Sequence, residues 1–361
     1  VLLMSEQLDL SKYIIRTDLA VEAKEIVDAK RVKQKVKRDS GIQIFEEIEK
    51  KVKITTVDID EKGEKEIGKK KGRYITLEMP DLRTDDHNVQ KNFMSVLKSQ
   101  IKKMMLYMNV SSDAEVFIVG LGNREVTPDA VGPIVVENLV ITRHLFTLQS
   151  WEVEKGYRSV AAMIPGVMGT TGIETSDMID AVIRKINPKL IVVIDALAAR
   201  SIQRRNTTVQ MTDTGIHPGS GVGNHRKELS QEVYGIPVLA IGVPTVVDAV
   251  SITSDTVDYL LTHLSREAEE MKKPSHVLVP SGMYFGKRKE EKNYEIPQEK
   301  RQAFMGLVGA LDEDEKRKLI HEVLTSMGLN FMVTPKEVDV YVRKIAEIIA
   351  ESLNDVLHTK I

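Results

Sequence analysis

The sequence predicts an α/β protein in three layers, in which helices cover both faces of a mostly parallel sheet. Residues 116–119, 190–194 and 237–243 are short apolar runs, which are typical of strands buried on both faces. Residues 86–108 and 174–186 each precede one of these runs and are expected to be helices. In the first of them, apolar side chains recur at helical spacing. This alternation of helix and strand favours a parallel sheet between two helical layers.

The segment before this core is expected to be different. Residues 41–80 are expected to form a β-rich subdomain, because residues 51–59 and 72–79 alternate between apolar and polar side chains and are separated by turn-forming residues. These strands could form a small antiparallel unit or extend the main sheet. Before them, residues 22–38 carry many charges, which is typical of a solvated helix face.

The other parts of the chain are assigned by the same patterns. Residues 113–271 are expected to form the α/β core. Residues 272–361 are expected to hold loops and C-terminal helices, because residues 312–326 and 335–358 are amphipathic.

The composition limits the classes of function. The chain has 51 Lys and Arg against 53 Asp and Glu, so its overall charge gives no support for direct binding of nucleic acid. It has no cysteine, which excludes disulfides, thiolate nucleophiles and Cys-ligated zinc. No apolar run approaches the ~20 residues that cross a bilayer, and residues 1–4 are too short for a signal peptide. We therefore expect a soluble intracellular protein with no membrane partner.

Residues 115–138 are the first candidate for a functional site. The expected strand is followed by Gly120 and Gly122, which allow a sharp turn and a close approach to a ligand. Asn123 lies in the same loop. Asp129 then stands at the expected start of a helix, which places its carboxylate near the carboxyl end of a strand, where ligands of open sheets bind.

A second aspartate has an equivalent place. Asp195 ends the apolar run 190–194, so two strand-end aspartates are expected to face one cleft. A nucleotide-binding loop is disfavoured, because Glu125 stands where the third glycine of that motif would be, and no Gly-Lys-Ser/Thr sequence occurs. On the residues alone, an aspartate such as Asp129 could instead only cap a helix.

The glycine-rich loop at residues 213–224 adds further candidates. His217 lies in this loop and His225 directly after it, and each could take part in the chemistry or only form hydrogen bonds. No His-Glu-x-x-His zinc motif occurs. Arg200 and Arg204 lie beyond the second aspartate, and either could pair with an acidic residue of a substrate or be exposed to solvent.

Six long motifs resemble the spore germination protease family of endospore-forming bacteria. They are LDLSKYIIRTDLAVEA, GRYITLE, GLGNREVTPDAVGP, IPGVMGTTGIET, VVIDALAARS and DTGIHPGSGVGN. The resemblance implies an endopeptidase that processes itself and degrades the small acid-soluble proteins that coat spore DNA. It also implies a homotetramer in the cytoplasm of the spore core that needs no cofactor.

The resemblance further implies that the chain is a zymogen. Residues 1–18 match a pro-segment and residues 19–361 a single protease domain, with self-cleavage between Asp18 and Leu19. The sequence Thr-Asp-Leu-Ala at 17–20 is similar to the cut sites of the substrates, which have Thr or Ser, an acidic residue, an apolar residue and a small one. Acidification of the developing spore is the family's setting for self-processing. We expect this arm to dock away from the two aspartates or in a non-reactive geometry.

The proposed chemistry is peptide hydrolysis by a carboxylate pair. Two carboxyl groups a few ångströms apart cannot both ionise cheaply, so Asp129 and Asp195 would share a proton. The ionised group would draw a proton from water and the protonated one would polarise the carbonyl, but either aspartate could have either role. A Ser or Cys nucleophile is disfavoured, because the chain has neither cysteine nor a Gly-x-Ser-x-Gly sequence.

Two alternatives remain. GLGN-x4-PDAVGP and VVIDAL also resemble, more distantly, the hydrogenase-maturation endopeptidases. This likeness favours a metal-dependent enzyme with Asp129, Asp195 and a loop histidine as ligands. Those enzymes have a glutamate and a neighbouring aspartate where this chain has Asp129 after Pro128, so we expect no metal. The second alternative is a non-enzymatic binder of small DNA-coating proteins in the same cleft.

Overall fold

The chain forms two compact units in the computed structural model. The larger unit contains Arg16–Val247 and Val333–Ile361, and the smaller contains Asp248–Met332. The structure describes residues 17–34, 41–148, 153, 155–217, 227–270, 298–324 and 331–358.

Among the described residues, nine strands form one sheet in the order β1-β2-β3-β7-β8-β6-β4-β5, with β9 paired to β8. The strands are β1 (Ile42–Glu49), β2 (Val52–Ile59), β3 (Gly72–Glu78), β4 (Val116–Gly120), β5 (Val160–Met163), β6 (Leu190–Ala199), β7 (Thr208–Thr212), β8 (Val238–Asp248) and β9 (Met332–Val333). Strands β8, β6, β4 and β5 are parallel, whereas β1, β2, β3 and β7 continue the sheet in antiparallel pairs. The expected α/β fold is confirmed, and the hairpin strands extend the main sheet.

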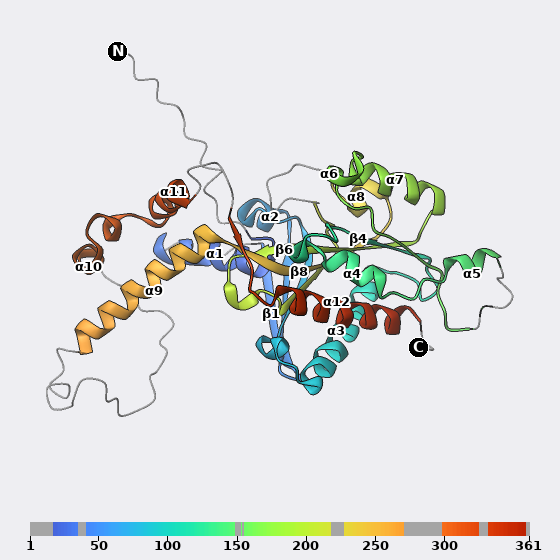
Figure 1. Ribbon diagram of the computed structural model, residues 1–361, viewed down its shortest axis with the longest axis horizontal. Coiled ribbons are helices and arrows are strands. Elements are labelled where there is room, and N and C mark those ends of the chain that lie inside the picture. The colour runs from blue at the N-terminus through green and yellow to red at the C-terminus, as the bar shows by residue number, and fades with distance from the viewer. Residues whose placement is uncertain are drawn as a thin grey trace, which may run out of the picture. The chain divides into compact units, whose positions relative to one another are not determined.

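Helices cover both faces of the sheet in the larger unit (Figure 1). Side chains of α3 (His87–Tyr107), α4 (Val131–Glu137) and α12 (Val338–Leu357) pack on one face. Side chains of α7 (Thr175–Ile186) and α8 (Gln231–Tyr234) pack on the other. The shorter or peripheral elements are α1 (Ala20–Gln34), α2 (Glu61–Ile67), α5 (Arg143–Leu148), α6 (Met168–Thr171), η2 (Pro80–Arg83), η3 (Thr127–Asp129) and η4 (Ile202–Arg204).

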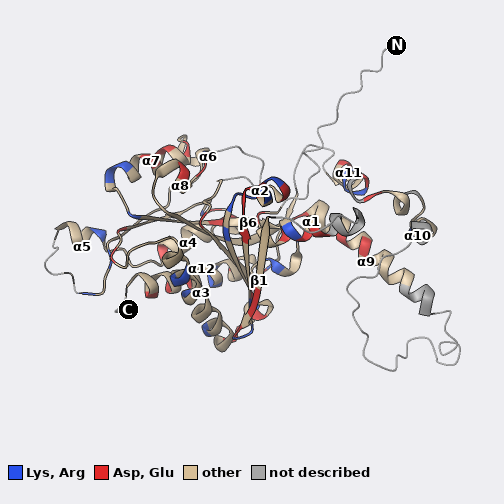
Figure 2. Ribbon diagram, turned by 180° about the vertical axis from the view of Figure 1, so that it is seen from behind, with Lys and Arg blue, Asp and Glu red and all other residues tan. Residues whose placement is uncertain are grey.

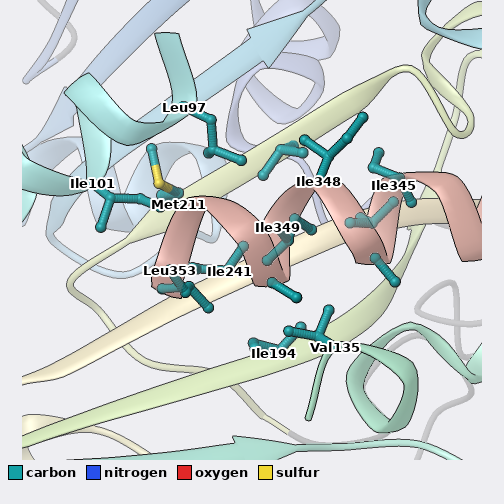
Figure 3. Close-up of a cluster of buried hydrophobic side chains, with 14 of the residues drawn as sticks. Leu97, Ile101, Val135, Ile194, Met211, Ile241, Ile345, Ile348, Ile349 and Leu353 are labelled. Carbon is teal, nitrogen blue, oxygen red and sulfur yellow. The ribbon is translucent and has the colours of Figure 1, made fainter. Parts of the chain in front are cut away.

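The C-terminal helix α12 is central to the main core. Its Ile345, Ile349 and Leu353 are at most 1% exposed and lie over the sheet residues Ile194 and Ile241 (Figure 3). Burial of one such side chain contributes about 1.5–3 kcal/mol to the free energy of unfolding. The helix predicted at 335–358 is thus a core element, because its apolar stripe matches this face of the sheet.

Charges of both signs are spread over the larger unit (Figure 2). Helix α7 carries Asp177 in its first turn and Arg184 and Lys185 in its last, which complements the helix dipole. No helix among the described residues is both long enough and apolar enough to span a bilayer.

Several element boundaries differ from the sequence-based expectation. Strand β7 was not expected, although Val209 and Met211 alternate there with polar residues. Strand β6 continues to Ala199, so Asp195 is not at its end. These strands extend beyond the purely apolar runs because their polar residues also pair within the sheet.

The smaller unit is helical. It contains α9 (Ala249–Glu270), α10 (Gln298–Ala310) and α11 (Glu313–Leu324). Helices α9 and α11 pack together, and Lys316 Nζ lies 2.7 Å from both carboxylate oxygens of Asp258. Gly306, with φ of 55°, breaks the path of α10.

Two glycines allow α4 to pack closely against the sheet. A Cβ atom at Gly132 would lie 2.3 Å from the carbonyl oxygen of Leu121 and 2.6 Å from that of Ile194. A Cβ atom at Gly120 would lie 2.3 Å from the carbonyl oxygen of Gly132. Because these neighbours are backbone atoms, they cannot move aside as a flexible side chain could. Both glycines of this motif are therefore required by packing.

Gly132→Ala is expected to lower the free energy of unfolding by about 1–3 kcal/mol, since the added methyl overlaps two backbone carbonyls. Urea denaturation followed by circular dichroism measures the change. Gly169→Ala is the matched control, because a Cβ atom there has nothing within 4 Å. Equal stability of the two variants would contradict this close packing.

Candidate active site

Asp129 is held at the carboxyl end of β4 by the loop before it. Its Oδ2 accepts a hydrogen bond from the backbone N–H of Asn123 (2.7 Å). Gly122 has a φ of +106°, and a Cβ atom there would lie 2.0 Å from the carbonyl oxygen of Asp129. Only glycine fits this position without strain. The predicted loop residues Gly122 and Asn123 therefore determine where the half-buried Asp129 lies.

The helix expected to begin at Asp129 begins at Val131 instead. Asp129 ends the 3-10 turn η3, and its backbone N–H donates to the carbonyl of Val126 (2.7 Å). Pro128 occupies this turn, where its fixed φ is compatible with the geometry. Asp129 thus lies in a 3-10 turn, one residue before Ala130, the N-cap of α4.

Asp195 lies beside the point where β4 stops. Gly120, the last residue of β4, pairs with Ile194, and the N–H of Leu121 donates to the carbonyl of Ile194 (2.8 Å). Asp195 is therefore the first residue of β6 after the stretch of that strand that pairs with β4. It is 8% exposed, and its Oδ1 accepts a hydrogen bond from the N–H of Ala196 (2.9 Å).

The elements that carry the two aspartates contact each other near the carboxyl end of β4. The turn η3, which contains Asp129, contacts β6, and α4 after it also packs on β6. The strand-end placement predicted for Asp195 was wrong in one respect, because β6 runs on through Ala199. The shorter strand β4 creates the edge, since it ends five residues before β6 does.

The segment around the expected cut site, residues 17–22, is called the arm here. It docks on the part of β6 that continues beyond Ile194, up to Ala199. Asp18 donates its N–H to the carbonyl of Ala198 (3.0 Å), and Asp18 Oδ2 accepts the N–H of Ala198 (2.8 Å). Leu19 and Ala20 are fully buried. The segment that resembles a substrate therefore lies three residues along the strand from Asp195.

Glu22 anchors the same arm, although its region was expected to be a solvated helix face. That expectation was wrong for Glu22, which is 1% exposed. Its two carboxylate oxygens accept the backbone N–H groups of Arg200 (2.7 Å) and Ser201 (3.0 Å). Lys69 Nζ donates to the carbonyl of Thr17 (3.0 Å). Burial lowers the pKa of Lys69, and the charges of Asp18 and Glu22 oppose that shift.

Arg204 contacts acidic residues of its own chain. Its guanidinium binds both oxygens of Glu25 (2.7 and 2.8 Å) and Glu78 Oε1 (2.6 Å), and it lies 3.4 Å from Glu22. Burial opposes the charge of Arg204, but the hydrogen bonds that it donates to Glu25 and Glu78 outweigh this effect and raise its pKa. Arg200 contacts the arm through its backbone. The role of either arginine with a substrate stays a prediction.

His217 lines a pocket that Asp18 of the arm also lines. The pocket has a volume of about 250 Å³ and is lined by Asp18, Leu197, Gln210 and His217 among others. His217 is half-exposed, and its Nε2 lies 3.4 Å from Glu228. His225 lies outside the described residues. Within those ranges, no three His, Asp or Glu side chains are grouped so that they could hold a metal ion.

Gln210 was not among the residues predicted for the site, although it contacts the arm. Its Oε1 accepts the N–H of Ala20 (2.8 Å), and its Nε2 donates to the carbonyl of Asp18 (3.2 Å). Gln210 lies on strand β7, and it follows its partner Ala20 by 190 residues in the chain. An isolated glutamine in an unrecognised strand carries no signal that could have identified it.

Comparisons with known proteins identify the family of this chain. The family described as germination protease matches residues 20–361. The germination protease of Priestia megaterium is 52% identical over 360 residues, which cover 99% of this chain and 97% of that protein. Those of Bacillus mycoides and Bacillus licheniformis are 54% and 53% identical, over 99% of this chain and 97% and 96% of theirs.

The fold is a mixed α/β sheet on which the segment around Asp18 docks along β6, the strand that carries Asp195. The chain belongs to the germination protease family. The resemblance found in its motifs is confirmed, and the protein is a protease.

Arg204→Met is expected to loosen α1, because Glu22 and Glu78 would lose the cation between them. The free energy of unfolding should fall by about 1–3 kcal/mol, the range for hydrogen bonds to charged groups. Hydrogen exchange should rise at residues 17–25 while the strands stay protected. Arg124→Met is the control, since Arg124 forms an exposed pair with Glu137. Unchanged exchange in the Arg204 variant would contradict an anchoring role.

Proposed function

We propose that this protein is an endopeptidase zymogen that cleaves itself between Asp18 and Leu19. The processed enzyme then begins the degradation of small acid-soluble DNA-binding proteins in the spore core during germination. The docking of the substrate-like arm at Ala198, three residues along β6 from Asp195, carries this proposal. Membership of a protease family favours the enzyme over a non-enzymatic binder.

The proposed reaction is hydrolysis by Asp129 and Asp195. The ionised aspartate takes one proton from a water molecule, whose oxygen bonds to the carbonyl carbon of Asp18. The protonated aspartate polarises the carbonyl oxygen. The Leu19 nitrogen then gains the proton that the aspartate took from water, its bond to the carbonyl carbon breaks, and it leaves as an amine. The new carboxyl group stays on Asp18. Water is the only co-reactant.

The docked arm also suggests why the zymogen persists. The N–H of Leu19 donates to Thr17 Oγ1 (3.1 Å), and α1 begins at Ala20, so the bond to be cut lies in a tight turn. Its leaving nitrogen is engaged and the segment is not extended. These two features support a docked arm in a non-reactive geometry, which would delay self-cleavage.

Asp129→Asn and Asp195→Asn should each fold normally and lose nearly all hydrolysis, because each removes the acid–base partner of the other. We expect rates at least 10³-fold below the parent, the scale of a general acid–base contribution together with charge stabilisation. Self-cleavage followed by mass spectrometry measures this loss. Asp113→Asn is the control, since this exposed aspartate lies before the opposite end of β4.

The same variants distinguish the mechanisms. Substantial activity in either aspartate variant would end the carboxylate-pair proposal. His217→Ala and His225→Ala should lose far less activity than the aspartate variants. A loss as deep as theirs, together with metal that copurifies and is required after chelation, would favour the metal-dependent enzyme.

Cleavage of the arm should become faster as the pH falls below neutral. A protonated Asp18 or Glu22 carboxyl loses its negative charge and part of its capacity to accept the N–H groups of Ala198, Arg200 and Ser201. Glu22→Gln imitates this state and should speed self-cleavage at neutral pH, with less further gain from acid. Asp28→Asn on the same helix is the control, because its carboxylate pairs with Lys24.

A chain that begins at Leu19 should hydrolyse substrate without the acid step. Asp18→Ala should slow processing of the full chain. If the Leu19-start protein were inert while the full-length chain degraded spore proteins, the pro-segment assignment would be wrong.

A further inference from the structure

One row of residues crosses the sheet between the arm and Asp195. Strand register aligns Thr55, Thr76, Gln210, Gly242 and Asp195 across β2, β3, β7, β8 and β6. Side chains at aligned positions of neighbouring strands lie on the same face of a sheet. Gln210 and Asp195 therefore share a face, with their Cα atoms about 10 Å apart because strands are spaced at about 4.8 Å.

Gly242 separates these two side chains. Gly242 has no side chain, so the side chain of Leu197 lies directly over its backbone. A Cβ atom at Gly242 would lie 2.3 Å from Leu197 Cδ1. Asp18, Gln210, Gly242 and Leu197 line one pocket. The arm thus lies in the space between Gln210 and the strand that carries Asp195.

Gln210 holds the backbone on both sides of the Asp18–Leu19 bond. Its Nε2 donates to the carbonyl oxygen of Asp18 (3.2 Å), which belongs to the bond to be cut. Its Oε1 accepts the N–H of Ala20 (2.8 Å). A carbonyl can only accept and a backbone N–H can only donate, so these partners fix the orientation of the amide. At 5% exposure, Gln210 has little water to compete for these bonds.

We propose that Gln210 is a further catalytic residue, which binds the carbonyl oxygen of the scissile bond and stabilises the charge that develops there. This proposal rests on the proposed cut between Asp18 and Leu19. A tetrahedral intermediate carries negative charge on that oxygen, so a preplaced N–H donor binds it more strongly than it binds the starting amide. Gln210 would act with the protonated aspartate and supply no proton.

The same contacts define what a separate substrate must present. Both bonds of Gln210 go to main-chain atoms, so they fit a peptide of any sequence. The carboxylate of Asp18 is held by a different contact, the N–H of Ala198. Gln210 therefore binds the main chain of the segment, whereas β6 binds the side chain before the cut.

The contact with Gln210 differs from the contacts that hold the arm in its latent geometry. Glu22 binds Arg200 and Ser201 from the first turns of α1 and does not touch the scissile bond. Release of Glu22 would free the first turns of α1, whereas Gln210 would still donate its hydrogen bond to the carbonyl oxygen of Asp18. Loss of Gln210 should therefore slow cleavage, whereas loss of a purely latent contact would speed it.

The test measures self-cleavage of the full-length chain by intact mass spectrometry from neutral to acidic pH. Gln210→Met removes both hydrogen bonds and should slow cleavage by about 10²-fold at every pH, the scale of one lost oxyanion donor. Gln210→Glu should be equally slow near neutral pH, because a carboxylate cannot donate to the carbonyl. As the introduced carboxyl gains a proton at lower pH, the deficit relative to the parent should shrink.

Gln100 provides the matched controls, since it is a buried glutamine (3% exposed) on α3 in the same unit. Gln100→Met and Gln100→Glu should show the pH profile of the parent, and circular dichroism shows which variants fold. Parental or faster cleavage in folded Gln210→Met would overturn this proposal alone. A Gln210→Glu deficit that does not change with pH would also overturn it. A parent that is not cut after Asp18 would overturn the proposed processing site and this inference with it.

Discussion

The close approach of two backbones at the end of β4 is the constraint on which the site depends. Gly120 and Gly132 allow the first turn of α4 to contact the carbonyls of Leu121 and Ile194. This contact fixes the loop that carries Asp129 next to the strand that carries Asp195. A side chain at either glycine would separate α4 from the sheet, and the separation would be transmitted to the aspartates. The motif around Asp129 therefore allows the close packing of α4 and also carries a residue of the proposed chemistry.

The unequal lengths of neighbouring strands supply the second part of the site. Strand β4 stops opposite Ile194, whereas β6 continues to Ala199. The extension offers the N–H and carbonyl of Ala198 to the arm, and the turn after it offers the N–H groups of Arg200 and Ser201. Carboxylates of Asp18 and Glu22 are suited to these donors, because hydrogen bonds to charged acceptors are stronger than neutral ones. One uncovered stretch of strand thus accounts for binding and, in our proposal, for latency.

The candidate site was partly predictable because several of its residues lie in continuous motifs. Gly122, Asn123 and Asp129 are close in sequence, and the turn geometry that joins them is local. Asp195 was found from an apolar run, but the length of its strand was not, since Ala196–Ala199 give no distinct pattern. Arg204 was expected to contact a substrate or to be exposed, and the structure shows it bound to Glu25 and Glu78, partners 179 and 126 residues away. Such pairs have no local signature.

The sequence by itself determined the α/β class, the core stripe of α12, the two aspartates as candidates and the family, because periodicity and contiguous motifs are local properties. Only the tertiary structure decided that β7 exists as a central strand and that Gln210 lies in one row with Gly242 and Asp195. It also decided that Glu22 is buried. The reason is physical: strand register and burial depend on which distant segments pack together, and a residue's own neighbours in the chain do not specify them.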